Sequence, residues 1–100
     1  MADKVLSMLG MAMRAGKVAS GEFSVEKSVK TGKSRLVIVS EEASDNTKKM
    51  FTNMCTYYNV PIYFYSSKEV LGHAIGKNGR ASVSVQDKGF ADTIINLMKS

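Results

Sequence analysis

Residues 17–35 contain five basic side chains, of the types that bind phosphate groups, together with a single aromatic ring. Ammonium and guanidinium groups attract phosphate oxygens, and an aromatic side chain such as Phe23 offers a face on which an unpaired base can stack. Only two carboxylates, Glu22 and Glu26, lie among them. This composition favours a polyanionic partner: RNA, DNA or an acidic membrane surface. The basic residues of the stretch are Lys17, Lys27, Lys30, Lys33 and Arg35.

The stretch predicts a helix over residues 21–31, and the phosphate-binding chemistry would be concentrated at its first turn. The unpaired N–H groups and the dipole at a helix N terminus favour a phosphate, and Gly21 would let a nucleic-acid backbone approach closely. Lys27 would reach a phosphate or a guanine edge, while phosphate contacts would come from Lys17, Lys30, Lys33 and Arg35. Two alternatives stay open: the lysines only keep a surface helix solvated, and Phe23 anchors the core instead of stacking on a base.

A second, smaller basic cluster lies in the sequence GKNGR at residues 76–80. Phosphate-binding loops of the P-loop and dinucleotide types follow a strand and precede a helix, whereas this loop is expected to follow a helix and precede a strand. We interpret it as a mobile loop in which Lys77 and Arg80 touch a nucleic-acid backbone and Asn78 offers hydrogen bonds. The alternative is a turn in which Gly and Asn supply positive φ angles.

No arrangement of side chains in the sequence indicates catalysis. His73, the single histidine, has no Ser, Cys or carboxylate at a spacing that suggests a triad, so we expect a surface or packing residue. Cys55 shares the apolar stripe of a predicted helix and is expected to be a buried thiol. Glu41 and Glu42 are adjacent, which favours a solvated turn. One Cys and one His cannot supply a four-ligand zinc site, so neither a metal nor a cofactor is expected.

The length and composition predict one globular domain over residues 1–100. The chain is 44% hydrophobic and 23% charged, with a net charge of +5. A chain of this length buries roughly 60–70% of the surface that its unfolded form exposes. The first residues lack the pattern of a signal peptide, and no apolar run is long enough to span a membrane. We therefore expect a monomeric cytoplasmic protein without membrane contact.

The hydrophobic periodicity predicts helices and strands that alternate along the whole chain. Residues 35–40 form a continuous β-branched run, typical of a strand buried on both faces, whereas residues 80–87 alternate like a half-exposed strand. The alternation favours a three-layer α/β/α sandwich around a small, largely buried sheet. The expected helices are 3–14, 21–31, 44–58, 66–76 and 88–98, and the expected strands are 17–20, 35–40, 60–66 and 80–87.

The ends and faces of the expected helices carry signals of their own. Tyr58 continues the apolar stripe of residues 44–58, so its ring is expected to face inward. Ser66 and Glu69 have the spacing of a capping box at the start of residues 66–76. The methionines fall mostly on helix faces and are expected to fill the core, with an exposed methionine stripe for a partner as the alternative.

Three stretches of the sequence follow one another as they do in a known family: GEFSVEKSVKTGKSRLVIVSEEAS, YYNVPIYFYSSKEVLGHAIGK and RASVSVQDKGF. The chain resembles the kink-turn-binding ribosomal proteins, the large-subunit family called L-seven-Ae in archaea, with the L-thirty-e proteins as relatives. The resemblance covers the whole chain and is greatest to the small bacterial, ribosomal-protein-like members. It implies a three-layer α-β-α sandwich with a four-stranded mixed sheet. It also implies binding to RNA, either ribosomal RNA or another structured RNA, and association with the ribosome. The usual binding site is a kink-turn, a sharply bent internal loop closed by tandem sheared G·A pairs.

In this family, a Gly-x-Asn-Glu-x-x-Lys motif at the start of the second helix lies in the major groove of the kinked RNA. Gly21 and Lys27 match its first and last positions, and Glu22 occupies the variable position after the glycine. Phe23 stands at the Asn position and Ser24 at the Glu position. Asn and Glu read the sheared guanines, and a good bidentate base contact is worth about 1–3 kcal/mol, so losing two costs on the order of a hundredfold in specificity. Ser24 retains one hydrogen bond for a residual base contact.

The family's second RNA contact is a loop that closes over the loop nucleotides of the RNA. It matches five residues here, which make it more basic than the usual apolar version: Lys77, Asn78, Gly79, Arg80 and Ala81. Two other functions stay open, because the same fold serves as a protein-interaction adaptor and as an accessory domain fused to RNA methyltransferases. Exposed methionines or Phe23 would form the patch of an adaptor. A chain of 100 residues without a cofactor loop argues against the enzyme role.

Overall fold

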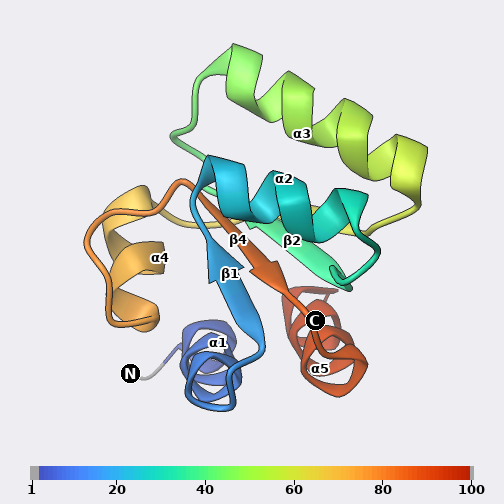
Figure 1. The fold of residues 1–100 in the computed structure, drawn as a ribbon. Coiled ribbons are helices and arrows are strands. Elements are labelled where there is room, and N and C mark those ends of the chain that lie inside the picture. The colour runs from blue at the N-terminus through green and yellow to red at the C-terminus, as the bar shows by residue number, and fades with distance from the viewer. Residues whose placement is uncertain (1–2, 100) are drawn as a thin grey trace.

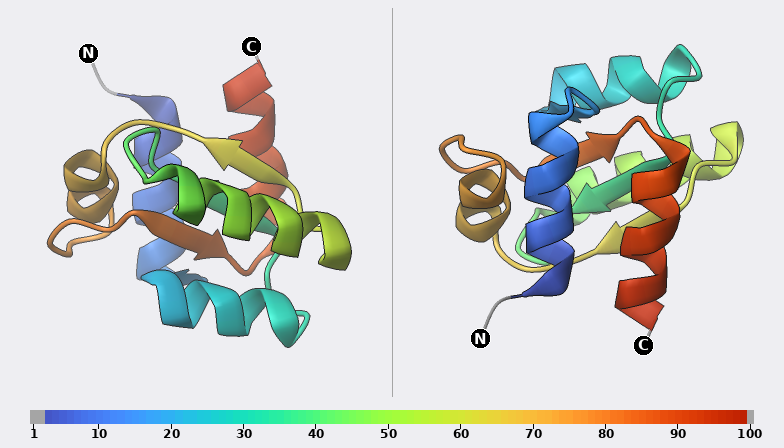
Figure 2. Two further views of the ribbon diagram at one scale, coloured as in Figure 1. Left: turned by 90° about the horizontal axis from the view of Figure 1, so that it is seen from above. Right: turned by 90° about the horizontal axis from the view of Figure 1, so that it is seen from below.

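The computed structural model describes residues 3–99, which form helices and strands in three layers (Figure 1). Helices α2 and α3 cover one face of a central sheet, α1 and α5 cover the other, and α4 packs beside α1 (Figure 2). No helix in this range is long and apolar enough to cross a membrane. The elements are α1 (Lys4–Arg14), β1 (Val18–Ser20), α2 (Glu22–Lys30), β2 (Leu36–Val39), α3 (Asp45–Tyr58), β3 (Ile62–Phe64), α4 (Lys68–Ala74), β4 (Ser82–Val85) and α5 (Lys88–Lys99).

The sheet is mixed, with the strand order β1-β4-β2-β3. β4 runs antiparallel to both of its neighbours, so that Val85 lies opposite Val18 on one side and Leu36 on the other. β2 and β3 are parallel, with Val37 opposite Ile62. These pairings confirm the expected three-layer sandwich with a four-stranded mixed sheet. Every helix and strand lies within two residues of its predicted bounds.

Each face of the sheet supports its own hydrophobic cluster, because the side chains of β2 alternate between the two faces. Leu36 and Ile38 belong to the cluster that α1, α4 and α5 complete. Val37 and Val39 belong to the cluster under α2 and α3, where Phe51 is the largest buried side chain. All four β2 side chains are fully buried, which confirms the prediction of a strand covered on both faces.

Strand β4 is buried along its whole length, so the expectation of a half-exposed strand is wrong. Its apolar side chains, Val83 and Val85, join the cluster with α1 and α5. Its serine face is not solvated because α2 covers it: the Oγ of Ser84 lies 2.9 Å from the Oγ of Ser28 and 2.8 Å from that of Ser34. These small hydroxyl groups satisfy one another away from water, so the alternation of polarity did not mark exposure here.

The start of α4 corrects a second expectation. Ser67, rather than Ser66, is the N-cap, and its Oγ accepts a hydrogen bond from the N–H of Val70 at 3.1 Å. Ser66 cannot form the capping box because its φ of 64° turns the chain between β3 and α4. The carbonyl of Ser66 accepts instead from the N–H of Glu41 at 2.9 Å. The cap of α4 thus lies one residue later than expected, and Ser66 joins the β2–α3 connection instead.

The predictions about single side chains of α3 have different outcomes. Cys55 is fully buried, as expected, and burial raises the pKa of its thiol to about 11, so it stays protonated at neutral pH. Tyr58 is 41% exposed rather than inward, because the last turn of α3 extends beyond the buried cluster. Within residues 3–99, the methionines are half-buried against the two clusters, as expected, except Met11, which is 46% exposed.

The side chain of Asp3 joins the start of α1 to the segment after β3. Its Oδ1 caps the helix by accepting from the N–H groups of Val5 and Leu6, and its Oδ2 accepts from the Tyr65 hydroxyl at 2.5 Å. The hydrogen bond from Tyr65 is the main reason why the pKa of Asp3 lies below its ordinary value of 3.8. The same bond raises the pKa of Tyr65 to about 12.

We expect Tyr65→Phe to lower the free energy of unfolding at neutral pH by about 1.5 kcal/mol, the low end for a hydrogen bond to a charged group. Because the pKa of Asp3 is lowered in the folded state, this contribution is complete above the ordinary pKa and is lost as the pH falls through the lowered one. Urea unfolding at a series of acid pH values should therefore show the two proteins converging. A difference that persists in strong acid would assign the effect to lost packing of the ring instead.

Candidate nucleic-acid interface

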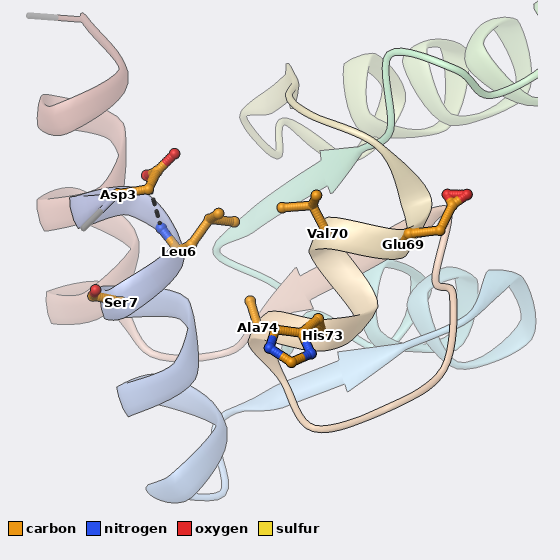
Figure 3. Close-up of a pocket in the computed structure, with 7 residues that line it drawn as sticks. All are labelled: Asp3, Leu6, Ser7, Glu69, Val70, His73 and Ala74. Carbon is orange, nitrogen blue, oxygen red and sulfur yellow. Dashed lines mark hydrogen bonds between the residues drawn. The ribbon is translucent and has the colours of Figure 1, made fainter. Parts of the chain in front are cut away.

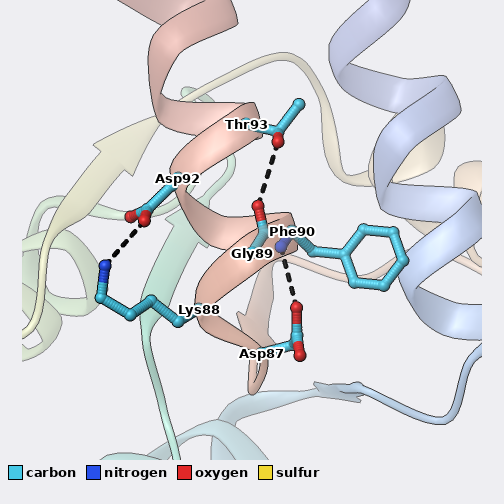
Figure 4. A network of polar contacts seen from close by, with 6 residues as sticks. All are labelled: Asp87, Lys88, Gly89, Phe90, Asp92 and Thr93. Carbon is cyan, nitrogen blue, oxygen red and sulfur yellow. Dashed lines mark hydrogen bonds and ion pairs between the residues drawn. The ribbon is translucent and has the colours of Figure 1, made fainter.

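The N terminus of α2 differs from the other helix starts because no side chain caps it. Its N-cap residue, Gly21, has a φ of 88°, which residues with a side chain rarely adopt. Elsewhere in residues 3–99, helix starts are capped by Asp3, Ser44, Ser67 and Asp87, the last through the N–H of Phe90 at 2.9 Å (Figure 4). The first-turn N–H groups of α2 therefore stay available for an external acceptor such as a phosphate oxygen.

The loop between α4 and β4 is held against α4 by backbone hydrogen bonds. The N–H of Lys77 donates to the carbonyl of Gly72 at 2.8 Å, and that of Arg80 donates to the carbonyl of Lys68 at 2.9 Å. Gly72 is required for this close fit, because a Cβ at that position would overlap the carbonyl oxygen of Asn78. The position of Arg80 thus follows from the position of α4.

The start of α2 and the α4–β4 loop meet across a groove of about 410 Å³. The Nε of Arg80 donates to the Oγ of Ser20 at 3.3 Å, and its Nη1 donates to the carbonyls of Asn78 and Gly79 at 3.2 and 3.0 Å. No carboxylate of residues 3–99 forms an ion pair with this guanidinium. An unpaired cation beside free N–H groups is the chemistry of a phosphate site. The groove is lined by Ser20, Gly21, Glu22, Phe23, Ser24, Gly79, Arg80 and Ala81.

Two further hollows continue this surface along α2. The first, of about 230 Å³, shares Phe23 and Ser24 with the groove and includes Lys27 and Lys33. The second, of about 350 Å³, shares Lys33 with the first. The three together form one continuous surface, which we call the α2 track. The other basic residues that line it are Lys17 and Arg35.

Three of the residues predicted from the sequence do not line the α2 track. Lys77 and Asn78 are exposed in the α4–β4 loop, and Asn78 contributes only the carbonyl that accepts from Arg80. Lys30 pairs with Glu26 on the outer face of α2, with its Nζ 2.6 Å from the Oε2, and this pairing raises the pKa of Lys30. The cations that do line the track have no carboxylate partner within the described part of the chain, so their charge can meet a phosphate.

Several residues that the sequence did not single out support this interface. Ser20 positions Arg80, and Gly72 admits the loop that carries it. Gln86 lines both hollows, and its Nε2 donates to the buried Oγ of Ser28 at 2.9 Å, which ties α2 to the end of β4. Ser20 and Gln86 act on partners that are 60 and 58 residues away, and Gly72 acts through its fit against the loop, so no local pattern marks these residues. Of these residues, only Ser20 could have been found from the sequence, because it lies next to the expected start of the helix.

A separate hollow of about 640 Å³ lies between α1 and α4 (Figure 3). His73 lines it as an exposed residue of α4, which confirms the expectation of a surface position. Asp3 and Glu69 are its charged residues, and neither Lys nor Arg lines it. Its charge is therefore opposite to that of the α2 track.

The fold and the α2 track together define a class of protein: small α/β sandwiches in which an uncapped helix start lies beside a basic loop. The residue pattern of the Ribosomal protein L7Ae/L30e/S12e/Gadd45 family matches residues 3–95, and the chain belongs to this family. This confirms the resemblance seen in the sequence.

Similar named proteins and similar solved structures are consistent with membership of this family. RNA-binding protein YlxQ of Bacillus subtilis (strain 168) is 46% identical over 91 residues, which cover 91% of each chain. Large ribosomal subunit protein eL8 of Thermoplasma volcanium is 32% identical over 88 residues, covering 87% of this chain and 73% of that protein. A Bacillus halodurans protein of unknown function, 37% identical, superposes with a TM-score of 0.96 over 99% of this chain and 100% of that one. The Giardia lamblia 15.5kD RNA binding protein has a TM-score of 0.80 over 99% and 88% of the two chains, and at 20% identity it shows that the fold is shared.

Proposed function

We propose that this chain is an RNA-binding protein that contacts a bent, kink-turn-like RNA through the start of α2 and the α4–β4 loop, with residues 1–100 acting as one domain. The observation that carries the proposal is the groove in which the uncapped start of α2 faces Arg80. The phosphates of a sharply bent backbone converge there and accept from the free N–H groups and the guanidinium. Family membership and the RNA-binding name of the Bacillus subtilis relative favour RNA among the polyanions.

The remaining residues of the interface divide between phosphates and bases. Lys17, Lys33 and Arg35 contact phosphates along the α2 track, and Lys77 and Asn78 contact the RNA from their exposed positions in the α4–β4 loop. Phe23 and Ser24 stand where the family reads sheared guanines, and both are exposed. The Phe23 ring stacks on an unpaired base and Ser24 makes one hydrogen bond to a base edge. The name of the archaeal relative, a large ribosomal subunit protein, favours ribosomal RNA as the target.

The double substitution Lys27→Ala with Arg80→Ala tests the proposed interface. Each lost phosphate contact makes the slope of log K against log[salt] shallower by about 0.7–0.9, so the pair should change the slope by about 1.5. Between 50 and 200 mM salt, the wild-type protein should therefore lose about eightfold more affinity than the double variant. Fluorescence anisotropy with a labelled stem that contains an internal loop of tandem G·A pairs measures both affinities.

The matched control is Lys4→Ala with Lys88→Ala, which removes the same charge from exposed positions of α1 and α5 on the other side of the sheet. It should leave the salt dependence close to that of the wild type. If both double variants change the slope equally, RNA binding follows net charge alone and the proposed interface is wrong.

A further inference from the structure

The outer face of α2 carries a ridge of three exposed side chains: Phe23, Lys27 and Lys30. Their spacing of i, i+4 and i+7 places them in one line along the helix. Phe23 is 79% exposed, so its ring is available to a ligand and does not anchor the core. The ridge thus leads from an aromatic ring at the groove to a cation at the other end of the helix.

A pair of exposed aromatic side chains, Tyr57 and Tyr58, ends α3. Tyr57 is 79% exposed, and its ring meets that of Tyr58 edge-on, with the centroids 4.9 Å apart. Helices α2 and α3 lie side by side and run in the same direction, so their C-terminal ends adjoin (Figure 1 and Figure 2). The pKa of Lys30, which Glu26 raises most, is also raised by Tyr58, in keeping with this proximity.

The side chain of Tyr57 lies on the side of α3 that faces α2. The ammonium of Lys48 lies 5.8 Å from the ring centre of Phe64, so Lys48 marks the side of α3 that faces β3. Tyr57 follows nine residues later, about two and a half helical turns, which places it on the opposite side. Because α2 packs over β1 and β4 at the other end of the sheet, that side is toward α2. Tyr57 therefore extends the ridge onto α3.

We propose that this ridge is a second RNA contact, which binds a single-stranded segment by stacking bases on Phe23 and Tyr57 and by pairing phosphates with Lys27 and Lys30. The proposal rests on the proposed function and adds a class of RNA to it: a bent element from which an unpaired strand leaves. Aromatic platforms interleaved with cations bind single strands with little sequence preference, because every base has a π-face. The ridge has this composition.

The length of the ridge sets the length of the strand. Lys30 follows Phe23 by seven residues, which is about 10 Å along a helix. A stacked strand advances about 3.4 Å per nucleotide, so about three nucleotides reach from Phe23 to Lys30. An extension of six nucleotides therefore spans the α2 part of the ridge and leaves about three nucleotides to continue toward Tyr57.

The carboxylates beside the ridge leave room for a phosphate. Glu26 and Lys30 form an exposed pair, with side chains 36% and 50% accessible, and such pairs are weak enough for a phosphate to displace the carboxylate. Lys27 forms no ion pair with a carboxylate of residues 3–99. Glu22 precedes Phe23 by one residue and so lies about 100° around the helix from it, off the line of the ridge.

Two labelled RNAs test the ridge: a blunt stem with an internal loop of tandem G·A pairs, and the same stem with six unpaired adenosines added to each strand in turn. The better placed extension should tighten binding to the wild-type protein by about 5- to 100-fold, the range for base–aromatic stacking. Tyr57→Ala should reduce this gain by about fivefold or more and leave the affinity for the blunt stem unchanged, whereas Tyr57→Phe should keep the full gain. If neither extension tightens binding, or if the full gain survives in Tyr57→Ala, the ridge does not bind RNA.

A second measurement separates this proposal from the proposed function. The chain has no tryptophan, so Tyr57→Trp supplies a single tryptophan at an exposed position, whose indole can be excited at wavelengths that the remaining tyrosines do not absorb. The free hexanucleotide A6 should quench it by stacking on the indole. Quenching by A6 without binding of the blunt stem would support the ridge and overturn the bent-RNA site. Binding of the blunt stem without quenching by A6 would overturn the ridge and leave the bent-RNA site intact.

Discussion

Replacing Gly72 by alanine is expected to lower the free energy of unfolding by about 1–3 kcal/mol, the usual cost of forcing an extra group into a well-packed site. A Cβ at this position would overlap the carbonyl oxygen of Asn78 and lie 2.7 Å from its carbonyl carbon. Both are backbone atoms, so the α4–β4 loop must move as a whole. Since that loop carries Arg80, RNA binding should weaken as well, although Gly72 itself lies outside the groove.

Urea unfolding and RNA titration measure the two effects, and Gly79→Ala is the matched control for stability. A Cβ at residue 79 would come no closer than 3.6 Å to the side chain of Lys68, an ordinary contact, so the free energy of unfolding should stay within about 1 kcal/mol of the wild type. Hydrogen exchange at the amides of Lys77 and Arg80 reports on the loop directly, because both donate to α4 carbonyls. Wild-type stability and exchange in Gly72→Ala would mean that the loop is not held by this fit.

The double substitution Phe23→Asn with Ser24→Glu is expected to raise discrimination between two RNAs by about a hundredfold. One RNA contains the tandem sheared G·A pairs and the other has Watson–Crick pairs in their place. Asn and Glu would restore the donor and acceptor set that the family uses on the sheared guanines, and each good base contact is worth about 1–3 kcal/mol. Both positions are exposed in the first turn of α2, where an added carboxylate also interacts favourably with the helix dipole.

Competition titrations give the ratio of the two dissociation constants for each protein. Phe23→Ala serves as the control, because it removes the ring without adding a donor or an acceptor and should leave the ratio as low as in the wild type. An unchanged ratio in the double variant would mean that the start of α2 does not lie against the G·A pairs.

Patterns within a few residues were enough to predict the type and order of the elements. The run at residues 36–39 is apolar at every position, which is typical of a short strand covered on both faces. The i, i+4 spacing of Phe51 and Cys55 predicted the buried face of α3 in the same way. The basic residues and Gly21 likewise pointed to the start of α2. The four-stranded mixed sheet came from the family resemblance and not from periodicity.

Contacts between residues far apart in the chain account for what local patterns missed. The hydroxyl of Ser84 is buried because α2 brings Ser28 to it from 56 residues away, so a pattern that predicts exposure elsewhere predicted it wrongly here. Arg80 lies beside the helix start because α4 holds its loop there, and its guanidinium meets Ser20, 60 residues earlier in the chain. Periodicity shows which side chains share a face, but burial and charge pairing depend on what packs over that face. The groove between the start of α2 and the α4–β4 loop therefore exists only in the folded chain.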